Sequence, residues 1–129
     1  MMKLCTGIDT IEIARLDEIN PTIRERFIQR VFTPLEISQA RDSNEFFGGL
    51  FAAKEAASKA LGTGIGFVRW QDIEIRHLPT GQPTVILHGN GRAVAEKLGL
   101  DTWSVSISHD RNKAIAVAVA IGPGDESQP

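Results

Sequence analysis

Two carboxylates and one ammonium group are the side chains of this sequence that could do chemistry together. Glu55 and Lys59 stand four positions apart in FAAKEAASKALGTGIG (51–66), so on a helix they share one face. Asp9 ends the apolar run KLCTGID (3–9), which predicts a strand. If the fold brings Asp9 to Glu55, the two carboxylates form a hard oxygen site suited to Mg²⁺, which usually shares its coordination shell with substrate phosphates. Lys59 would then neutralise phosphate charge that the metal does not reach.

A simpler interpretation of Glu55 and Lys59 is an exposed helix ion pair that contributes about 0.2–0.5 kcal/mol. The composition of the helix argues against it, because surface helices more often carry long polar side chains than alanines. Small side chains let other backbone or a ligand approach closely. The alanines are Ala52, Ala53, Ala56, Ala57 and Ala60. Glycines then follow the helix at 62, 64 and 66 rather than preceding one, so Walker and Rossmann nucleotide sites are not expected.

A second polar cluster is SISHD (106–110), at the end of a predicted strand. Ser106, Ser108 and His109 are expected to point at one region of space, whereas Asp110 begins a turn. A Ser-His hydrolase built on Ser106 and His109 is an alternative function, but the sequence has no Gly-x-Ser-x-Gly elbow. Cys5, in an apolar strand, is expected to be a packing residue rather than a nucleophile.

Periodicity and turn signals place these residues on an alternation of strands and helices. Thr33-Pro34-Leu35-Glu36 predicts a capping box, Asn44 is expected to cap the long helix, and Gly62 to end it. The apolar run 114–121 is expected to be a strand buried on both faces. Helices are expected over 11–18, 24–32, 33–41, 44–61 and 90–98, and strands over 3–9, 70–78, 84–88, 103–108 and 114–121. This order predicts one α+β domain over 1–121, in which a mostly antiparallel sheet packs with one long helix and several short helices, followed by a polar tail over 122–129.

Composition excludes several other classes of protein. A chain of 129 residues is large enough for one core without covalent staples. The net charge of -2 gives no field that would hold nucleic acid or an anionic membrane. The single cysteine rules out an internal disulfide. With no signal segment and no apolar run of about 20 residues, a cytoplasmic location is expected.

Five segments resemble, in the same order, the holo-acyl-carrier-protein synthases, the small bacterial type of 4'-phosphopantetheinyl transferase. They cover most of residues 3–121. The segments are GID with EIARL (7–16), RFIQRVFTPLE (26–36), FAAKEAASKALGTGIG (51–66), DIEI with GQP (72–83) and SVSISHD (104–110).

The resemblance implies transfer of phosphopantetheine from coenzyme A to a serine of apo acyl carrier protein, leaving adenosine 3',5'-bisphosphate. It implies that Asp9 and Glu55 hold Mg²⁺ and that Lys59 contacts phosphate. The serine proton could go to a metal-bound water or hydroxide, to Glu55 or to a histidine. The nucleotide is expected beside a further group of residues, namely Gly62, Gly81, Pro83, Ser106 and His109.

The resemblance also implies a homotrimer with active sites at the subunit interfaces, so that Asp9 and Glu55 meet a neighbour's SISHD segment. Arginines on the first helices are expected to bind the acidic carrier: Arg15, Arg24, Arg26 and Arg30. Asp17, Glu18 and Glu25 dilute this basic surface. Leu50 stands where the family usually has arginine, so one phosphate or carrier contact is in doubt. A catalytically silent module that binds coenzyme A or carrier protein is the main alternative, although it would not need to keep both carboxylates.

Overall fold

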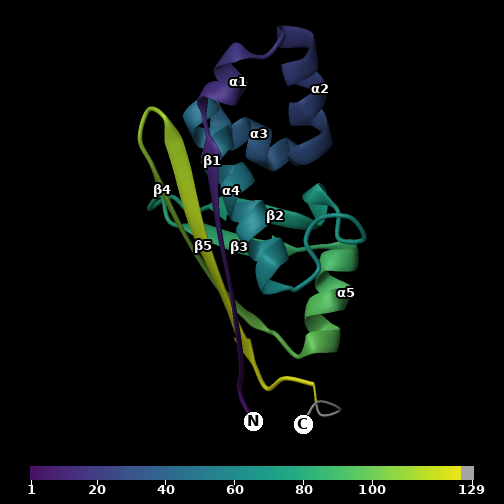
Figure 1. The fold of residues 1–129 in the computed structure, drawn as a ribbon. Helices are drawn as coiled ribbons and strands as arrows, with labels where there is room; N and C mark the ends of the chain where they lie inside the picture. The colour runs from purple at the N-terminus through teal and green to yellow at the C-terminus, as the bar shows by residue number, and fades with distance from the viewer. Residues whose placement is uncertain (126–129) are drawn as a thin grey trace.

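The computed structural model describes residues 1–125 as a set of short helices gathered around one long helix and two small sheets (Figure 1). The strands are β1 (Lys3–Glu12), β2 (Ile73–His77), β3 (Pro83–Leu87), β4 (Thr102–His109) and β5 (Lys113–Gly122). The helices are α1 (Ala14–Glu18), α2 (Pro21–Val31), α3 (Pro34–Ala40), α4 (Asn44–Ala60) and α5 (Gly89–Leu98), with a 3-10 turn over Trp70–Asp72.

Both sheets are antiparallel, which confirms the α+β prediction. One sheet has the order β1-β5-β4, and the other is the β2-β3 hairpin. Helix α4 packs against the three-stranded sheet, and α1, α2 and α3 gather at one end of the molecule (Figure 1). The chain therefore carries its long helix between the sheet and the hairpin. Among residues 1–125, no helix combines the length and the apolarity that a membrane crossing requires.

Strand β1 is longer than the sequence pattern indicates. The helix expected from Ile11 begins only at Ala14, because Ile11 and Glu12 still pair with Ala114 and Lys113 of β5. Hydrogen bonds from a partner strand more than 100 residues away in sequence outweigh a weak local helical pattern. As a result, Asp9 lies inside a strand rather than at its end.

Helix boundaries follow the capping chemistry of the sequence with two differences. The capping box of Thr33 and Glu36 is present, which confirms that prediction. Helix α2 begins at Pro21, because the Asn20 side chain accepts a hydrogen bond from the Thr22 amide at 2.8 Å. The expected cap of α4 was wrong, since Ser43 rather than Asn44 caps the helix and accepts from Phe46 N at 3.2 Å.

The alanines of α4 face the sheet rather than a ligand. Ala52, Ala53, Ala56 and Ala57 are fully buried and pack in one core with alanines of β5. Backbone also comes very close, because a Cβ added at Gly7 of β1 would lie 1.9 Å from the Ala56 carbonyl oxygen. The small residues of α4 therefore let β1 lie almost against the helix backbone, and this contact places Asp9 beside α4.

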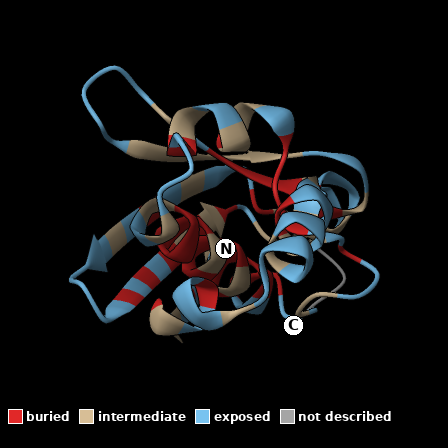
Figure 2. Cartoon of the chain, turned by 90° about the horizontal axis from the view of Figure 1, so that it is seen from above, coloured by how far each residue is buried: buried red, intermediate tan, exposed pale blue. Residues whose placement is uncertain are grey.

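Strand β5 is buried on one face only, so the prediction of a strand covered on both faces was wrong for the single chain. Its alanines at 114, 116, 118 and 120 are at most 1% exposed, whereas Ile115 and Val117 are 40% and 37% exposed. Alternating bands of burial along the strand are visible in Figure 2. The branched residues thus form part of an exposed sheet face.

The end of β5 closes the described part of the domain. The strand continues to Gly122, one residue beyond the predicted boundary, and the Gly124 amide donates to the Gly99 carbonyl at 3.1 Å. The rest of the predicted polar tail, residues 126–129, lies outside the described residues. In the hairpin, Trp70–Asp72 forms a 3-10 turn, so β2 begins at Ile73 rather than at residue 70.

Candidate active site

Asp9 and Lys59 meet across the contact between β1 and α4. Lys59 Nζ lies 3.0 Å from Asp9 Oδ1 and also donates to the Ile8 carbonyl at 3.0 Å. Glu55 lies one helical turn before Lys59, and its carboxylate interacts electrostatically with both Asp9 and Lys59. The three side chains singled out from the sequence therefore form one cluster.

The electrostatics of this cluster favour a bound cation. Partial burial raises the pKa of the Glu55 carboxyl, and the negative charge of Asp9 raises it further, while Lys59 offsets part of the effect. Two carboxylates that disfavour each other's ionisation are stabilised together by a positive ion. Oxygen donors are the ligands that Mg²⁺ prefers. Asp9 and Glu55 thus fit Mg²⁺ as a pair of carboxylate ligands. Within residues 1–125, no larger group of three or more His, Cys, Asp or Glu side chains is placed to hold a metal ion.

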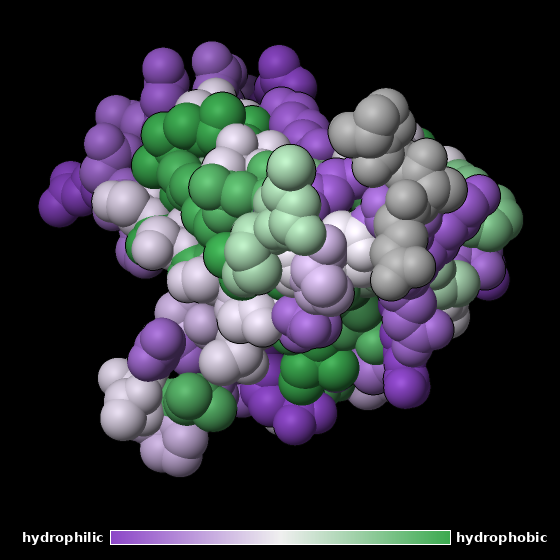
Figure 3. All heavy atoms as spheres, turned by 90° about the horizontal axis from the view of Figure 1, so that it is seen from below, coloured by the Kyte–Doolittle hydropathy of each residue, from purple (hydrophilic) through white to green (hydrophobic). Residues whose placement is uncertain are grey.

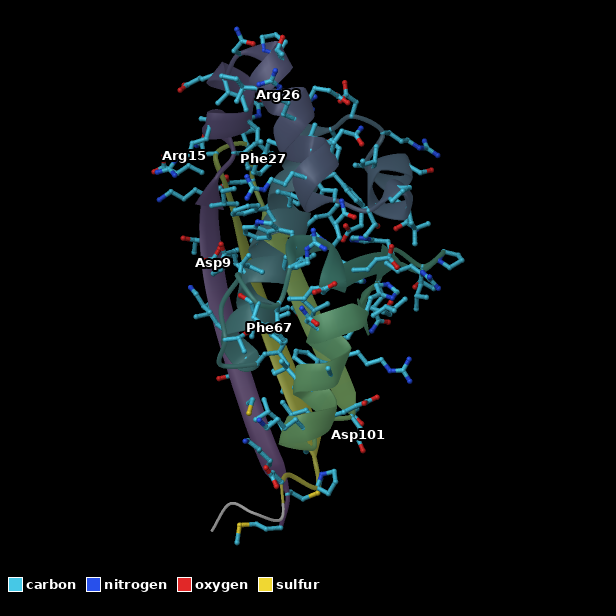
Figure 4. All side chains as sticks on the ribbon, turned by 90° about the vertical axis from the view of Figure 1, so that its right-hand side faces the viewer. Asp9, Arg15, Arg26, Phe27, Phe67 and Asp101 are labelled. Atoms are coloured by element: carbon cyan, nitrogen blue, oxygen red, sulfur yellow. The ribbon has the colours of Figure 1, made fainter. Side chains whose placement is uncertain are left out.

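A cavity of about 700 Å³ opens beside the two carboxylates. Asp9 and Glu55 lie on its wall together with Arg15, whose side chain points from α1 on the same side of the molecule as Asp9 (Figure 4). Thr10, Ile11 and Glu12 of β1 and Lys113 of β5 complete this end of the wall, and the opposite part is apolar: Leu16, Ile19, Ile23, Phe27 and Phe51. The cavity therefore joins a charged end to an apolar trough.

The two phenylalanines of this trough were not identified as site residues from the sequence. Phe27 and Phe51 have ring centroids 5.6 Å apart, and Phe51 also stacks on Trp70 at 4.8 Å. Spacing could have identified Phe51, because it precedes Glu55 by four positions and shares its helix face. Phe27 had no such signal, since only tertiary packing brings α2 onto α4.

Three of the five residues expected near the nucleotide, Gly81, Pro83 and His109, line a separate cavity of about 350 Å³, whereas Gly62 and Ser106 do not. Gly81 and Pro83 of the hairpin face His109 of β4 there, and His109 Nδ1 lies 3.7 Å from a Glu45 carboxylate oxygen. Leu50 also lines this cavity and is fully buried. No residue lines both this cavity and the Asp9 cavity. Within a single chain, the two predicted parts of the site therefore lie apart.

Ser106 lies away from both cavities in the single chain. Successive side chains of a strand point to opposite faces, so Ser106 and Ser108 share the outer sheet face with Val117, whereas His109 points to the other face. The expectation that Ser106, Ser108 and His109 converge was therefore wrong. The same alternation removes the geometric basis for a Ser106-His109 hydrolase within one chain.

Gly62 follows Leu61, the C-cap residue of α4, and so stands at the end of the helix as predicted. Its amide donates to the Lys59 carbonyl at 3.0 Å, and its φ of +79° belongs to the left-handed region that favours glycine. Apart from its two neighbours in the chain, no heavy atom of the described residues lies within 4 Å of a Cβ built on Gly62. The helix thus ends at Ala60, one residue beyond Lys59, with open space above the backbone of Gly62.

The arginines proposed from the sequence divide into two groups. Arg24 is largely enclosed, binds Asp42 at 2.9 Å and donates two hydrogen bonds to Asn44, so it fastens α2 to the start of α4. That role withdraws Arg24 from the carrier-binding set. Arg15, Arg26 and Arg30 are exposed. Arg26 lies at the helical end of the molecule, near Phe27 (Figure 4).

Comparison with known proteins shows which family this chain resembles in sequence. Residues 5–120 match the family model described as the 4'-phosphopantetheinyl transferase superfamily. The chain is 43% identical over 121 residues to the holo-[acyl-carrier-protein] synthase of Natranaerobius thermophilus, covering 92% of this chain and 97% of that protein. It is 42% identical over 126 residues to the enzyme of the same name from Herpetosiphon aurantiacus, covering 92% and 99%.

Solved structures are similar over nearly the whole fold. Holo-[acyl-carrier-protein] synthase of Helicobacter pylori in complex with coenzyme A superimposes with a TM-score of 0.80 at 36% identity, covering 89% of this chain and 98% of that one. The Bacillus anthracis enzyme in complex with CoA (3',5'-ADP) gives 0.76 at 34% identity, covering 95% and 99%. By family model, sequence and fold alike, this chain belongs to the 4'-phosphopantetheinyl transferase superfamily, among the holo-[acyl-carrier-protein] synthases.

Proposed function

We propose that this protein transfers 4'-phosphopantetheine from coenzyme A to a serine hydroxyl of apo acyl carrier protein, with Mg²⁺ held by Asp9 and Glu55. The observation that carries the proposal is the cluster of Asp9, Glu55 and Lys59, which the fold assembles from two elements at the edge of an open cavity. Coenzyme A is bound in the related structures from Helicobacter pylori and Bacillus anthracis, whose names also specify the carrier protein as acceptor.

In the proposed reaction the serine oxygen of the carrier attacks the β-phosphorus of coenzyme A, and the serine proton passes to a general base. The bond from that phosphorus to the bridging oxygen breaks, and adenosine 3',5'-bisphosphate leaves with the electron pair. Mg²⁺, when bound, would supply Lewis-acid stabilisation of the charge on the pyrophosphate. Lys59 reaches Asp9 with a side chain that is 49% exposed, so its ammonium group can turn to a phosphate oxygen. It would stabilise the negative charge that develops on the leaving group.

The function is tested by incubating the protein with apo acyl carrier protein, coenzyme A and Mg²⁺ and weighing the carrier by mass spectrometry. The expected result is a mass gain of one phosphopantetheine group, which is lost when a chelator removes the metal. A carrier that keeps its apo mass, with every acidic carrier tried, would instead favour a silent binding module.

We further propose that the active enzyme is a homotrimer, in which a neighbour's His109 cavity completes the site at Asp9. Two features of the chain support this. The two cavities are separate within one chain, and the outer face of the β1-β5-β4 sheet exposes large apolar side chains on β1 and β5. Leu4 and Ile8 of β1 are 64% and 55% exposed beside Ile115 and Val117 of β5. At the end of the molecule where the termini lie, hydrophobic side chains gather on the surface (Figure 3). Such faces mark interaction sites.

Introducing charge on this sheet face will dissociate the assembly. Ile8 and Val117 are cross-strand partners, so Ile8→Glu/Val117→Glu places two like charges side by side on the exposed face. We expect the double variant to sediment as a folded monomer and to lose most of its turnover, because no neighbour then supplies His109. The control is Ala93→Glu/Lys97→Glu, which places two like charges on the exposed side of α5, away from the sheet face, and should keep the native mass and activity. A variant that keeps the mass and activity of the native protein would contradict this interface.

We propose that Arg15 and Arg26 bind the acidic carrier. Both side chains are exposed, and no ion pair of either is found among residues 1–125. Replacing both by glutamate should raise the KM for the carrier by about 10- to 100-fold, because two attractive contacts become repulsive. The KM for coenzyme A should change little. Steady-state kinetics against each substrate measures the difference, and an equal rise in both KM values would contradict a carrier-specific role.

We place this activity in the cytoplasm. The only cysteine, Cys5, is a free thiol that packs against the core, as expected from the sequence. A single unpaired thiol is the usual state in a reducing compartment.

A further inference from the structure

A buried ion pair lies directly behind the proposed metal-binding carboxylate. Lys54, the residue before Glu55, has its ammonium group 2.8 Å from Glu36 Oε1, and both side chains are fully buried. Fully buried lysine and glutamate are rare, and a well-packed apolar pair at such a position is often equally stable or more stable. The stability of the fold therefore gives no sufficient reason for two charges here.

Every polar atom of this pair is used to join elements of the fold. Lys54 Nζ, with three donors, also donates to the Trp70 carbonyl at 3.0 Å and to the Ile73 carbonyl. Glu36 accepts from the amides of Thr33 and Ile75, each at 2.8 Å. The pair therefore fixes α4 to α3 and to the start of β2 through directional bonds.

The opposite side of α4 is fixed by a different contact. Gly7 of β1 approaches the backbone of Ala56 and Ala60 so closely that a Cβ would overlap it. Consecutive helix residues are about 100° apart around the axis, so Lys54 and Ala56 lie about 200° apart. Glu55 lies between them, about 100° from each, and faces Asp9. Two anchors on opposite sides of the helix thus set the rotation of α4 that aims Glu55.

We propose that Lys54 and Glu36 are positioning residues, which hold Glu55 at the orientation needed to share a Mg²⁺ ion with Asp9. This inference rests on the proposed function. An apolar pair would fill the same space but would allow the helix to rotate or slide, because dispersion contacts carry no direction. Residues that orient a metal ligand typically change metal affinity or activity by about 10- to 100-fold when they are replaced.

The test is the double variant Lys54→Met/Glu36→Gln, which removes both charges and keeps the side-chain lengths. It is expected to fold with a somewhat lower Tm, because the Trp70 and Ile73 carbonyls lose their donor although no lone charge stays buried. Calorimetric titration with Mg²⁺ in the presence of coenzyme A should show binding about 10-fold weaker. In the carrier assay, kcat should fall about 10-fold, with the KM for the carrier unchanged.

Two further variants make the outcome decisive. Arg92→Met/Glu96→Gln removes an exposed ion pair on α5, remote from Glu55, and should change neither Mg²⁺ binding nor kcat. Glu36→Gln alone leaves the Lys54 ammonium group buried without its counter-ion, so it should lower the Tm more than the double variant does and weaken Mg²⁺ binding in the same direction. A folded double variant with native Mg²⁺ affinity and native kcat would overturn the proposal. Loss of the folded state in both Glu36 variants would also overturn it, since the pair would then serve stability alone. Failure of the proposed function is distinguishable, because the native protein itself would then leave the carrier unmodified.

Discussion

Glu55→Gln will reduce Mg²⁺-dependent transfer by about 10³-fold, the effect expected when one group that stabilises transition-state charge is lost. Gln keeps the length of the side chain and its helix propensity, but it lacks the negative charge that Mg²⁺ requires of its protein ligands. Asp9 would then be the only carboxylate of the cluster facing Lys59. Rates of carrier modification at saturating coenzyme A, followed by mass spectrometry over a range of Mg²⁺ concentrations, measure the loss.

The matched control for this substitution is Glu96→Gln, which removes an exposed glutamate from α5. It should leave the rate within about twofold of the native value, since surface substitutions away from a site have small effects. Native turnover by Glu55→Gln would show that the metal assignment is wrong and would move the catalytic role to other residues of the cavity.

The same substitution should raise the stability of the metal-free protein at neutral pH. Burial and the nearby Asp9 charge raise the pKa of Glu55 in the folded state, so the folded protein holds that proton more tightly than the unfolded chain. The free energy of unfolding therefore falls as pH rises from the ordinary glutamate pKa through the raised pKa. A glutamine at this position does not titrate, so the variant has no such fall in the free energy of unfolding. Thermal unfolding at roughly pH 4 and pH 7 should show a gain in Tm for Glu55→Gln that is larger at pH 7. If Glu55 formed only an ordinary exposed ion pair with Lys59, Glu55→Gln would instead lower the Tm at pH 7.

Gly7→Ala will move Asp9 on β1 away from Glu55 and Lys59 on α4, because it pushes the strand away from the helix. The new Cβ would lie 1.9 Å from the Ala56 carbonyl oxygen and 2.9 Å from the Ala60 amide nitrogen, and helix backbone cannot yield as a flexible side chain does. We expect a loss of about 3 kcal/mol in the free energy of unfolding, with a Tm lower by roughly 10 °C. Asp9 follows Gly7 by two residues on β1, so turnover should fall by about 100-fold in the molecules that still fold.

Thermal unfolding and the carrier assay, run on the same preparation, measure both effects of Gly7→Ala. Thr6→Ala is the control, because Thr6 is exposed on the outer face of the same strand. Its stability should change by less than about 1 kcal/mol. A Gly7→Ala protein with native Tm and native turnover would contradict the close approach of β1 and α4.

The sequence by itself was sufficient wherever the deciding interactions are local. Thr33 and Glu36 cap a helix through groups three residues apart, Gly62 follows the end of α4 with positive φ, and the hairpin turns at 78–82, within one residue of the predicted 79–83. Glu55 and Lys59 share a face because helix geometry fixes their spacing. In each case the competing conformations differ in a few backbone torsions and nearby hydrogen bonds, which residue type alone decides.

Only the tertiary structure decided which elements contact one another and which side chains meet. Pairing with β5 extended β1 past Asp9, and the close contact of Gly7 with α4 brought Asp9 to Lys59. The same packing assigned the alanines of α4 to the sheet, enclosed Arg24 and turned Ser106 away from His109. Lys54 and Glu55 are neighbours in sequence, yet one is buried against Glu36 and the other faces the cavity. Residue type could not distinguish them, because the direction of a side chain depends on how the whole helix is rotated against its neighbours, and long-range contacts set that rotation.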